Sequence, residues 1–385
     1  MSSKKILFIS QNASRSGAPI LLLSIIQKLH LDFDIDVLFL QGGEILEEFN
    51  PLSTNILTIN SFQKKYNLYN KITATLTQRK TLLNKEQLEK KAIDYIVNKN
   101  YDVIIGNTIA TLHFLLQLPK TNKAIYLHEL TYALEANYSK NYIVENLSKI
   151  PKIFAGSDSV KENLKCRYSI NENRIETIHS FVDEKDSKIV LTNVELRNKL
   201  MISSDTVILG LMSTPELRKG TDLLPQIAKC IVKKQPQLDF KIVNIGGKEN
   251  DSFINQVRLD AEKINISDKF IFIPSTTNPN DFINMFDLFL LPSREDPFPL
   301  VMHMSGNFQK PIIAFKDSGG ISEVIPQPQL AEYLDIEDYS DKIIELCLNK
   351  TKRLQYGKEL KETLNSNFSG DISIAKLKAA ISEML

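Results

Sequence analysis

The chain has 385 residues, which at roughly 150 residues per domain predicts two domains. Its 47 Lys and Arg residues nearly balance its 46 Asp and Glu residues, and this balance argues against a dedicated nucleic-acid-binding protein, which would carry a strong basic excess. Cys166, Cys230 and Cys347 stand far apart without a CxxC pair, so neither a disulfide framework nor a zinc site is predicted, and a reducing compartment is expected.

Short apolar runs alternate with helix-length amphipathic segments along the first half of the chain. Residues 20–29 are typical of these helical segments. The runs predicted to be buried parallel strands are 6–9, 37–40, 103–105, 124–127 and 153–155. Strands that alternate with helices predict βαβ units and a parallel sheet.

The basic segment 61–100 holds nine Lys or Arg residues against three acids. A basic amphipathic helix can lie on anionic lipid, but because the acids are interspersed, a solvated helical face is the favoured interpretation. No stretch of the sequence approaches the ~20 apolar residues that span a bilayer. We therefore expect a cytoplasmic protein, with peripheral contact at the inner face of the membrane as the open alternative.

The same alternation of strands and helices restarts at residue 207. The predicted strands of the second half are 207–210, 240–243, 270–273, 288–291 and 311–314. Two such runs predict an α/β fold with two Rossmann-like, doubly wound domains. We place these domains at 1–190 and 191–368, because the polar stretch 183–188 between them has the composition of a linker. The remaining segment, 369–385, is predicted to form a helix with Asp371 as its N-cap and to pack back on the N-terminal domain.

Ligands of open α/β sheets bind at the carboxyl ends of the strands, and two such ends in the first half carry candidate residues. Gly17 lies in the turn after the first strand, where glycine lets the backbone approach a ligand and free helix N–H groups favour anions or hydroxyls. An ordinary turn is the equal alternative, and a NAD site is not favoured because Gly17 is the only glycine of that turn. His128 follows the strand that ends at Leu127; a packing or capping histidine is the alternative.

Three strand ends of the second half carry denser groups of polar residues. Segment 216–220 places two adjacent cations beside a helix start, which suits a diphosphate. Segment 292–301 runs from a buried strand into consecutive charges, and segment 315–323 combines a glycine pair with an early helix acid. The candidate binding residues of these groups are Arg218, Lys219, Glu295, Asp296, Phe298, Pro299, Leu300, Val301, Gly319, Gly320 and Glu323.

Residues 218–220, 292–301, 310–315 and 319–323 resemble the C-terminal half of the retaining glycosyltransferases of family four, within the glycosyl transferases group 1. Segments 16–19 and 156–161 fit more loosely. The resemblance implies the GT-B fold, in which two Rossmann-like domains face each other across a cleft. It also implies a nucleoside-diphosphate sugar donor, UDP- or GDP-linked, on the C-terminal domain. A glycan or lipid-linked acceptor would bind the N-terminal domain.

The resemblance assigns roles to the candidate residues. Lys219, with Arg218 beside it, matches the diphosphate-binding cations, and residues 298–301 would offer backbone amides to phosphate and sugar. His128 matches the histidine near the reacting carbon. Asp296 matches the first acid of a paired-acid motif. The family needs no metal or other cofactor.

The chain departs from the family at the second acid of that motif. Counting eight residues on from Asp296 reaches Met304, where the family has the Glu that grips the ribose hydroxyls, and counting from Glu295 reaches His303. A thioether is a weak hydrogen-bond acceptor. Asp32 and Asp34 form the single DxD-like stretch, and because they precede a strand we interpret them as turn residues and not as metal ligands.

The main hypothesis is therefore a retaining hexosyltransferase of surface polysaccharide synthesis, in which His128, Arg218 and Lys219 act at the reaction. The alternative is a non-catalytic GT-B homologue that acts as a partner subunit, because Met304 replaces the second acid. A sugar-nucleotide epimerase of the same fold is less favoured. The sequence predicts neither the donor sugar nor the acceptor, and it predicts no oligomeric state.

Overall fold

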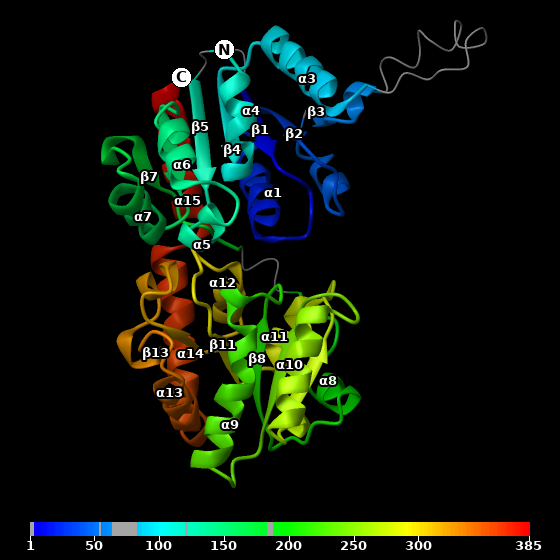
Figure 1. Ribbon diagram of the computed structural model, residues 1–385, viewed down its shortest axis with the longest axis vertical. Helices are drawn as coiled ribbons and strands as arrows, with labels where there is room; N and C mark the ends of the chain where they lie inside the picture. Colours follow the sequence, from blue (N-terminus) through cyan, green and yellow to red (C-terminus); the bar gives the residue numbers. More distant parts are fainter. Residues whose placement is uncertain (1–3, 54, 64–82, 120–121, 183–187) are drawn as a thin grey trace, which may run out of the picture. The chain divides into compact units, whose positions relative to one another are not determined.

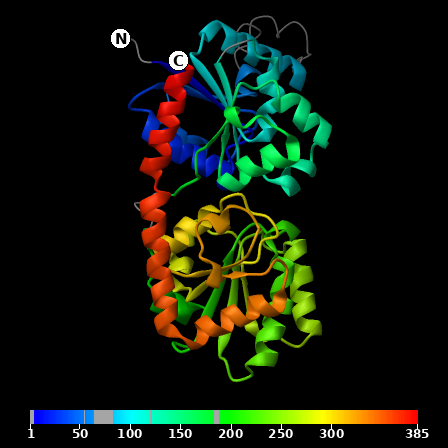
Figure 2. The same cartoon turned by 90° about the vertical axis from the view of Figure 1, so that its left-hand side faces the viewer.

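The computed structural model describes residues 4–53, 55–63, 83–119, 122–182 and 188–385. The chain divides into two compact units: an N-terminal unit formed by Met1–His179 with Asp371–Leu385, and a C-terminal unit formed by Ser180–Gly370. The sequence-based boundaries lie nearby, at 190 and 368. Each unit is built around its own parallel sheet, with helices on both faces (Figures 1 and 2).

The N-terminal unit contains a parallel sheet in the order β3-β2-β1-β4-β5-β6-β7. Its strands are β1 (Lys5–Ser10), β2 (Asp34–Phe39), β3 (Asn55–Thr58), β4 (Val103–Asn107), β5 (Asn122–Leu127), β6 (Lys152–Ala155) and β7 (Ile175–Thr177). Its helices are α1 (Gly17–Leu29), α3 (Lys85–Lys99), α4 (Leu112–Gln117), α5 (Thr131–Glu135), α6 (Lys140–Leu147), α7 (Asp158–Tyr168) and α15 (Gly370–Met384).

Alternating residues of each strand supply the two cores of this unit. Leu7 and Ile9 of β1 pack into the cluster covered by α3, α4, α6 and α7. Side chains alternate along a strand, so Ile6 and Phe8, which are also buried, point to the opposite face. A strand buried on both faces reads as a continuous apolar run, which is why such runs predict these strands.

Helix α15 belongs to the N-terminal unit although it ends the chain. Its apolar face is buried, with Leu377 and Ile381 at most 1% exposed. Ion pairs add contacts at the surface, among them Lys28 Nζ of α1 with Asp371 Oδ1 at 2.9 Å and Lys378 Nζ with Asp32 Oδ2 at 2.5 Å. The helix begins at Gly370, so the prediction that Asp371 is its N-cap is wrong. Asp371 instead lies in the first turn, where a carboxylate is favoured by the helix dipole.

The C-terminal unit contains a parallel sheet in the order β10-β9-β8-β11-β12-β13. Its strands are β8 (Val207–Met212), β9 (Phe240–Ile245), β10 (Phe270–Ile273), β11 (Leu288–Leu291), β12 (Ile312–Phe315) and β13 (Leu330–Ala331). Its helices are α8 (Asn193–Lys199), α9 (Leu224–Lys234), α10 (Ser252–Lys263), α11 (Pro279–Met285), α12 (Leu300–Asn307), α13 (Ile336–Leu348) and α14 (Lys350–Asn367). Residues of α9 and α13 pack on one face of the sheet, and residues of α8, α11, α12 and α14 pack on the other.

The prediction of two Rossmann-like α/β domains is confirmed, and each predicted strand run overlaps an observed strand. Strands β3, β7 and β13 were not predicted from the sequence. These strands are short and lie at or beside the edge of a sheet, so they lack the long apolar run of a central strand.

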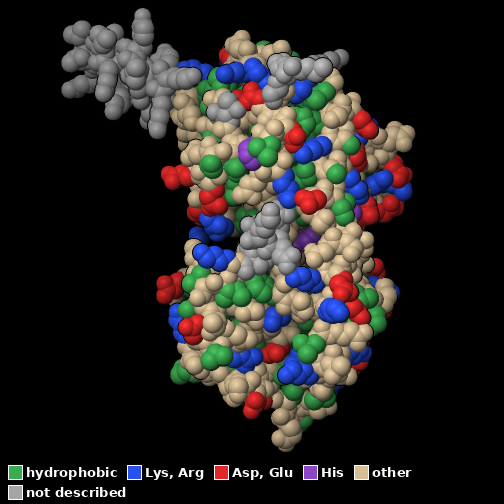
Figure 3. Space-filling model, turned by 180° about the vertical axis from the view of Figure 1, so that it is seen from behind, with side chains coloured by type: hydrophobic (Ala, Val, Ile, Leu, Met, Phe, Trp, Pro, Cys, Tyr) green, Lys and Arg blue, Asp and Glu red, His purple; other side chains and the backbone are tan. Residues whose placement is uncertain are grey.

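The basic segment 61–100 is described only in part. Residues 64–82, which hold several of its cations, lie outside the described residues. Within α3, Leu88, Ala92 and Ile96 are buried in the core of the N-terminal unit. Among the described residues, no helix combines the length and the apolar character needed to cross a bilayer. Cationic and anionic side chains are interspersed over the face of both units that Figure 3 shows.

Candidate functional site

The loop after β1 contains Gly17, which forms the first residue of α1 behind the N-cap Ser16. A Cβ atom added to Gly17 would meet nothing within 4 Å, so packing does not require glycine there. Gly43, which the sequence analysis did not select, is more constrained. Its Cβ would lie 2.2 Å from the backbone carbonyl of Ala13, so the loop after β2 packs directly on the loop after β1.

His128 lies directly after β5, at the carboxyl edge of the N-terminal sheet. Its ring centroid is 4.1 Å from that of Tyr126, and its Nε2 lies 2.9 Å from Oδ1 of Asn107. Burial lowers the pKa of His128 to about 3, so the imidazole is neutral near pH 7. Glu129 accepts the backbone N–H groups of His128 at 2.8 Å and Ile109 at 3.0 Å, and thereby ties the ends of β4 and β5 together.

In the C-terminal unit, Lys219 and Asp296 form a close ion pair at the carboxyl edge of the sheet. The Nζ and Oδ2 atoms are 2.6 Å apart, and the side chains are only 17% and 6% exposed. Lys219 ends a short 3-10 helix, and Gly220 follows it with a φ of +70°. A Cβ atom on Gly220 would lie 1.9 Å from the carbonyl oxygen of Pro292, so the loop after β8 touches the loop after β11 at this glycine.

Further hydrogen bonds and ion pairs join these two loops. Arg218 donates to the carbonyl oxygen of Glu295 at 3.0 Å and to Glu216 Oε1 at 2.6 Å. The Arg294 guanidinium binds both carboxylate oxygens of Asp222 at 2.8 Å. The backbone N–H of Arg294 also donates to the carbonyl of Arg218 at 2.8 Å. Arg218 and Arg294 thus hold the loops that present Lys219 and Asp296.

The loop after β12 completes this group. The backbone N–H of Asp296 donates to the carbonyl of Ser318 at 2.6 Å, and the N–H of Gly320 donates to the carbonyl of Asp296 at 3.1 Å. Gly319 has a φ of +123° and a ψ of −149°, a region essentially limited to glycine. Glu323 lies in the short helix that starts at Gly320 and is half-buried.

The predicted residues Phe298 and Pro299 lead into α12, and Leu300 and Val301 are the first two residues of that helix. Phe298 is buried, and its ring packs 5.5 Å from that of Phe368 and 5.6 Å from that of His303, measured between centroids. Met304, at the position of the family's second acid, packs against the apolar cluster that α12 shares with α14. The structure therefore gives Met304 a packing role.

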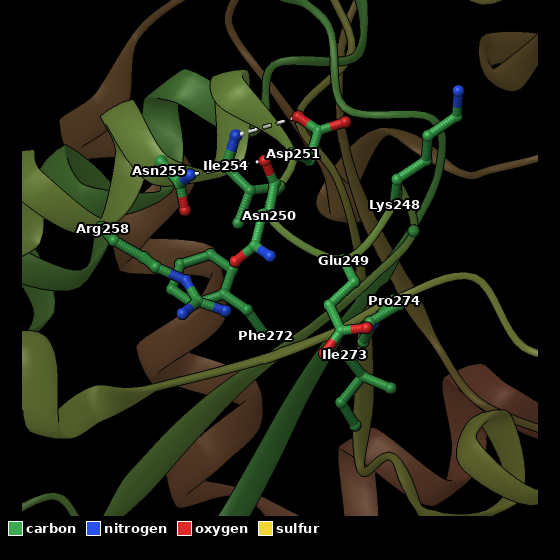
Figure 4. A pocket seen from close by; sticks show the side chains of 11 residues that line it. Lys248, Glu249, Asn250, Asp251, Ile254, Asn255, Arg258, Phe272, Ile273 and Pro274 are labelled. Atoms are coloured by element: carbon green, nitrogen blue, oxygen red, sulfur yellow. Dashed lines mark hydrogen bonds between the residues drawn. The ribbon is translucent and has the colours of Figure 1, made fainter.

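A fourth loop, after β9, was missed by the sequence analysis. Gly246 and Gly247 adopt φ values of +140° and +80°, and a Cβ on Gly246 would lie 1.9 Å from the carbonyl oxygen of Ser213. The signal was a glycine pair directly after a predicted strand. Beside it lies a pocket of about 270 Å³, in which the Arg258 guanidinium lies 5.0 Å from the ring centroid of Phe272 (Figure 4).

Residues 193–363, which make up most of the C-terminal unit, match the family model described as Glycosyl transferases group 1. The similarity to that family model therefore lies within the C-terminal unit. The first two curated relatives are an uncharacterized glycosyltransferase of Haemophilus influenzae and the poly(ribitol-phosphate) alpha-N-acetylglucosaminyltransferase of Staphylococcus aureus. The first is 30% identical over 34% of this chain, and the second is 24% identical over 62% of this chain. The matches span only 36% and 45% of the two relatives' own lengths, respectively.

A third relative is similar to this chain over a longer region. The capsular polysaccharide biosynthesis glycosyltransferase CapM of Staphylococcus aureus is 24% identical over 81% of this chain and 83% of CapM. Anabaena HepE, crystallised with UDP and glucose, has a TM-score of 0.79 at 15% identity and covers 99% of this chain and 100% of HepE. Staphylococcus aureus TarM has a TM-score of 0.73 at 14% identity, over 98% and 99% of the two chains. These likenesses show the two-domain fold of the GT-B glycosyltransferases.

Proposed function

We propose that this chain is a glycosyltransferase that moves a sugar from a nucleoside-diphosphate sugar, UDP- or GDP-linked, to a glycan or lipid-linked acceptor. The proposal includes retention of the anomeric configuration and a role in surface polysaccharide synthesis. Its main support is the group of loops that converges on Lys219 and Asp296 in the C-terminal unit. The names of the relatives that act in capsule and poly(ribitol-phosphate) glycosylation agree with it.

The proposed chemistry follows from the arrangement of charge. An ammonium group has three N–H donors, so Lys219 can bind a phosphate oxygen while it keeps its bond to Asp296. In the transfer, the bond between the anomeric carbon and the diphosphate breaks, and the acceptor oxygen bonds to that carbon on the same face. The acceptor proton ends on the released diphosphate. Lys219, with Arg218 beside it, stabilises the growing charge of the leaving group.

The low exposure of Lys219 strengthens this effect, because a charge–charge interaction is larger where water is partly excluded. The fixed loops add preorganisation: Arg218 holds the backbone of Glu295, and Gly220 allows close contact with Pro292. In this proposal His128, on the N-terminal unit, binds a hydroxyl of a sugar.

One observation favours a second candidate, the non-catalytic partner subunit. Met304 packs into the apolar cluster of the C-terminal unit at the position where the family carries an acid for the ribose diol. A chain that binds no nucleotide, or binds one without transferring its sugar, would fit this second candidate.

A thermal-shift screen with UDP, GDP, ADP, CMP and their common sugars tests the proposal. A ligand at a hundred times its Kd stabilises the protein by about 2.7 kcal/mol. We expect a shift with UDP or GDP that is lost in Lys219→Ala and kept in Lys358→Ala, which removes a lysine that is 71% exposed on α14. A transfer assay in the presence of EDTA then tests metal independence. No shift with any nucleotide would contradict the proposal.

A further inference from the structure

Asn107, at the carboxyl end of β4, is 1% exposed and has a defined orientation. Its Nδ2 donates to the backbone carbonyl of Ala18 in α1 at 3.2 Å, and its Oδ1 lies 2.9 Å from His128 Nε2. A carbonyl oxygen only accepts hydrogen bonds, so Nδ2 must face Ala18. Turning the amide over would bring two acceptors together. Oδ1 of Asn107 therefore faces the histidine.

This orientation determines which nitrogen of His128 carries the proton. Oδ1 is an acceptor, so Nε2 of His128 must donate. The imidazole is neutral near pH 7 because burial lowers its pKa, and a neutral imidazole has a single N–H group. Nδ1 consequently carries a lone pair. It is buried and has no hydrogen-bond partner among the described residues.

A buried Nδ1 lone pair without a donor is unfavourable, because an unsatisfied buried polar atom costs about 1–3 kcal/mol. A ligand or a water molecule that donates a hydrogen bond to Nδ1 would remove this cost. Phosphate and carboxylate oxygens cannot serve, since they are acceptors themselves. A hydroxyl group can donate to Nδ1. Sugars offer such groups, and the strand end is where an open α/β sheet binds its ligand.

The backbone beside Asn107 is held in a strained conformation. Thr108 has a φ of +85° and a ψ of 158°, a region that is essentially limited to glycine and costs of order 1–3 kcal/mol. Its N–H donates to the carbonyl of Tyr126 at 2.8 Å, and the next N–H, of Ile109, donates to Glu129. These bonds hold the end of β4 against β5, so Asn107 cannot relax away from His128. Strain of this kind is characteristic of functional sites.

We infer that Asn107 is a positioning residue that keeps His128 as the Nε2–H tautomer, so that Nδ1 accepts a hydrogen bond from a sugar hydroxyl. The contacts of Asn107 place a proton on Nε2, and the lone pair on Nδ1 follows because the ring is neutral. The identity of the hydroxyl as part of a sugar rests on the proposed function.

Histidine-selective 15N NMR of the full chain tests the tautomer directly, because the two ring nitrogens differ in chemical shift when one is protonated. The His128→Gln variant assigns the signal. We expect the Nε2–H form in the wild type and a mixture of both neutral tautomers in Asn107→Leu. The matched control is Asn146→Leu, which replaces a buried asparagine of α6 in the same unit and should leave the His128 signal unchanged. A wild-type signal from the Nδ1–H form, or from imidazolium, overturns the inference.

The role of the tautomer is tested by measuring kcat for sugar transfer, with the donor that the thermal-shift screen identifies. We expect Asn107→Leu to lower kcat by about 10- to 100-fold, by analogy with the loss when the partner that orients a metal-bound histidine is removed, and to leave the Kd for the free nucleotide unchanged. Equal kcat values for Asn107→Leu and Asn146→Leu overturn the positioning role. If no donor is bound or transferred, the proposed function and the sugar assignment fail, while the NMR result still decides the tautomer. The wild-type spectrum decides it even if Asn107→Leu does not fold.

Discussion

The two units share a parallel sheet with helices on both faces, yet their strand ends carry different chemistry. In the C-terminal unit the loops meet through charges: Lys219 with Asp296, and Arg294 with Asp222. In the N-terminal unit the corresponding edge holds a neutral histidine bonded to an amide. Under the proposed function, the charged strand ends bind an anionic group and the neutral ones bind hydroxyls.

The largest predicted effect on stability lies at the ion pair of the C-terminal unit. Asp296→Ala leaves Lys219, whose side chain is only 17% exposed, without its carboxylate, and breaking a largely buried pair costs about 3–5 kcal/mol of unfolding free energy. Asp341→Ala breaks a pair of similar length, 2.8 Å, whose aspartate is 59% exposed, and should cost about 1 kcal/mol or less. Urea denaturation of both variants measures the difference. Similar losses would show that the Lys219 pair behaves as a surface contact.

Glycine-to-alanine substitutions in one strand-end loop of each unit are expected to have a smaller effect on stability. Gly220→Ala forces a Cβ to within 1.9 Å of the Pro292 carbonyl at a positive φ, so we expect a loss of about 1–3 kcal/mol and weaker nucleotide binding. Gly17→Ala meets open space at the start of α1 and should be neutral or slightly stabilising. Thermal denaturation and nucleotide titration check both. A loss of stability in Gly17→Ala as large as that in Gly220→Ala would contradict the open space beside Gly17.

The smallest predicted effect is the pH dependence of the N-terminal unit. The pKa of His128, about 3, lies below the usual 6.5, so between these values the unfolded chain binds more protons and stability falls as the pH drops. Relative to pH 8, the loss at pH 6 should be about 1 kcal/mol. His128→Gln should remove this dependence, and His113→Gln, at a side chain that is 55% exposed, should retain it. Denaturation at several pH values measures the slope. A slope unchanged by His128→Gln would contradict a His128 that stays neutral in the folded protein.

The sequence predicted those features that depend on local patterns. The central strands follow from continuous apolar runs, and the strand-end groups of the C-terminal unit follow from charges placed directly after such runs. The contacts between loops could not be predicted. Arg294 and Asp222 are 72 residues apart, and their pairing depends on how two loops fold over one sheet edge. Gly43 illustrates the same limit, because its close contact with Ala13 depends on the paths of two separate loops.

The central claim is that the C-terminal unit binds the charged diphosphate and that His128 binds a hydroxyl. Isothermal titration of the nucleoside diphosphate selected by the screen, into wild type, Lys219→Ala and His128→Gln, tests it most directly. We predict at least a tenfold weaker Kd in Lys219→Ala, about 1.4 kcal/mol, and an unchanged Kd in His128→Gln. Binding that is insensitive to Lys219, or that His128→Gln weakens as strongly, would contradict the account.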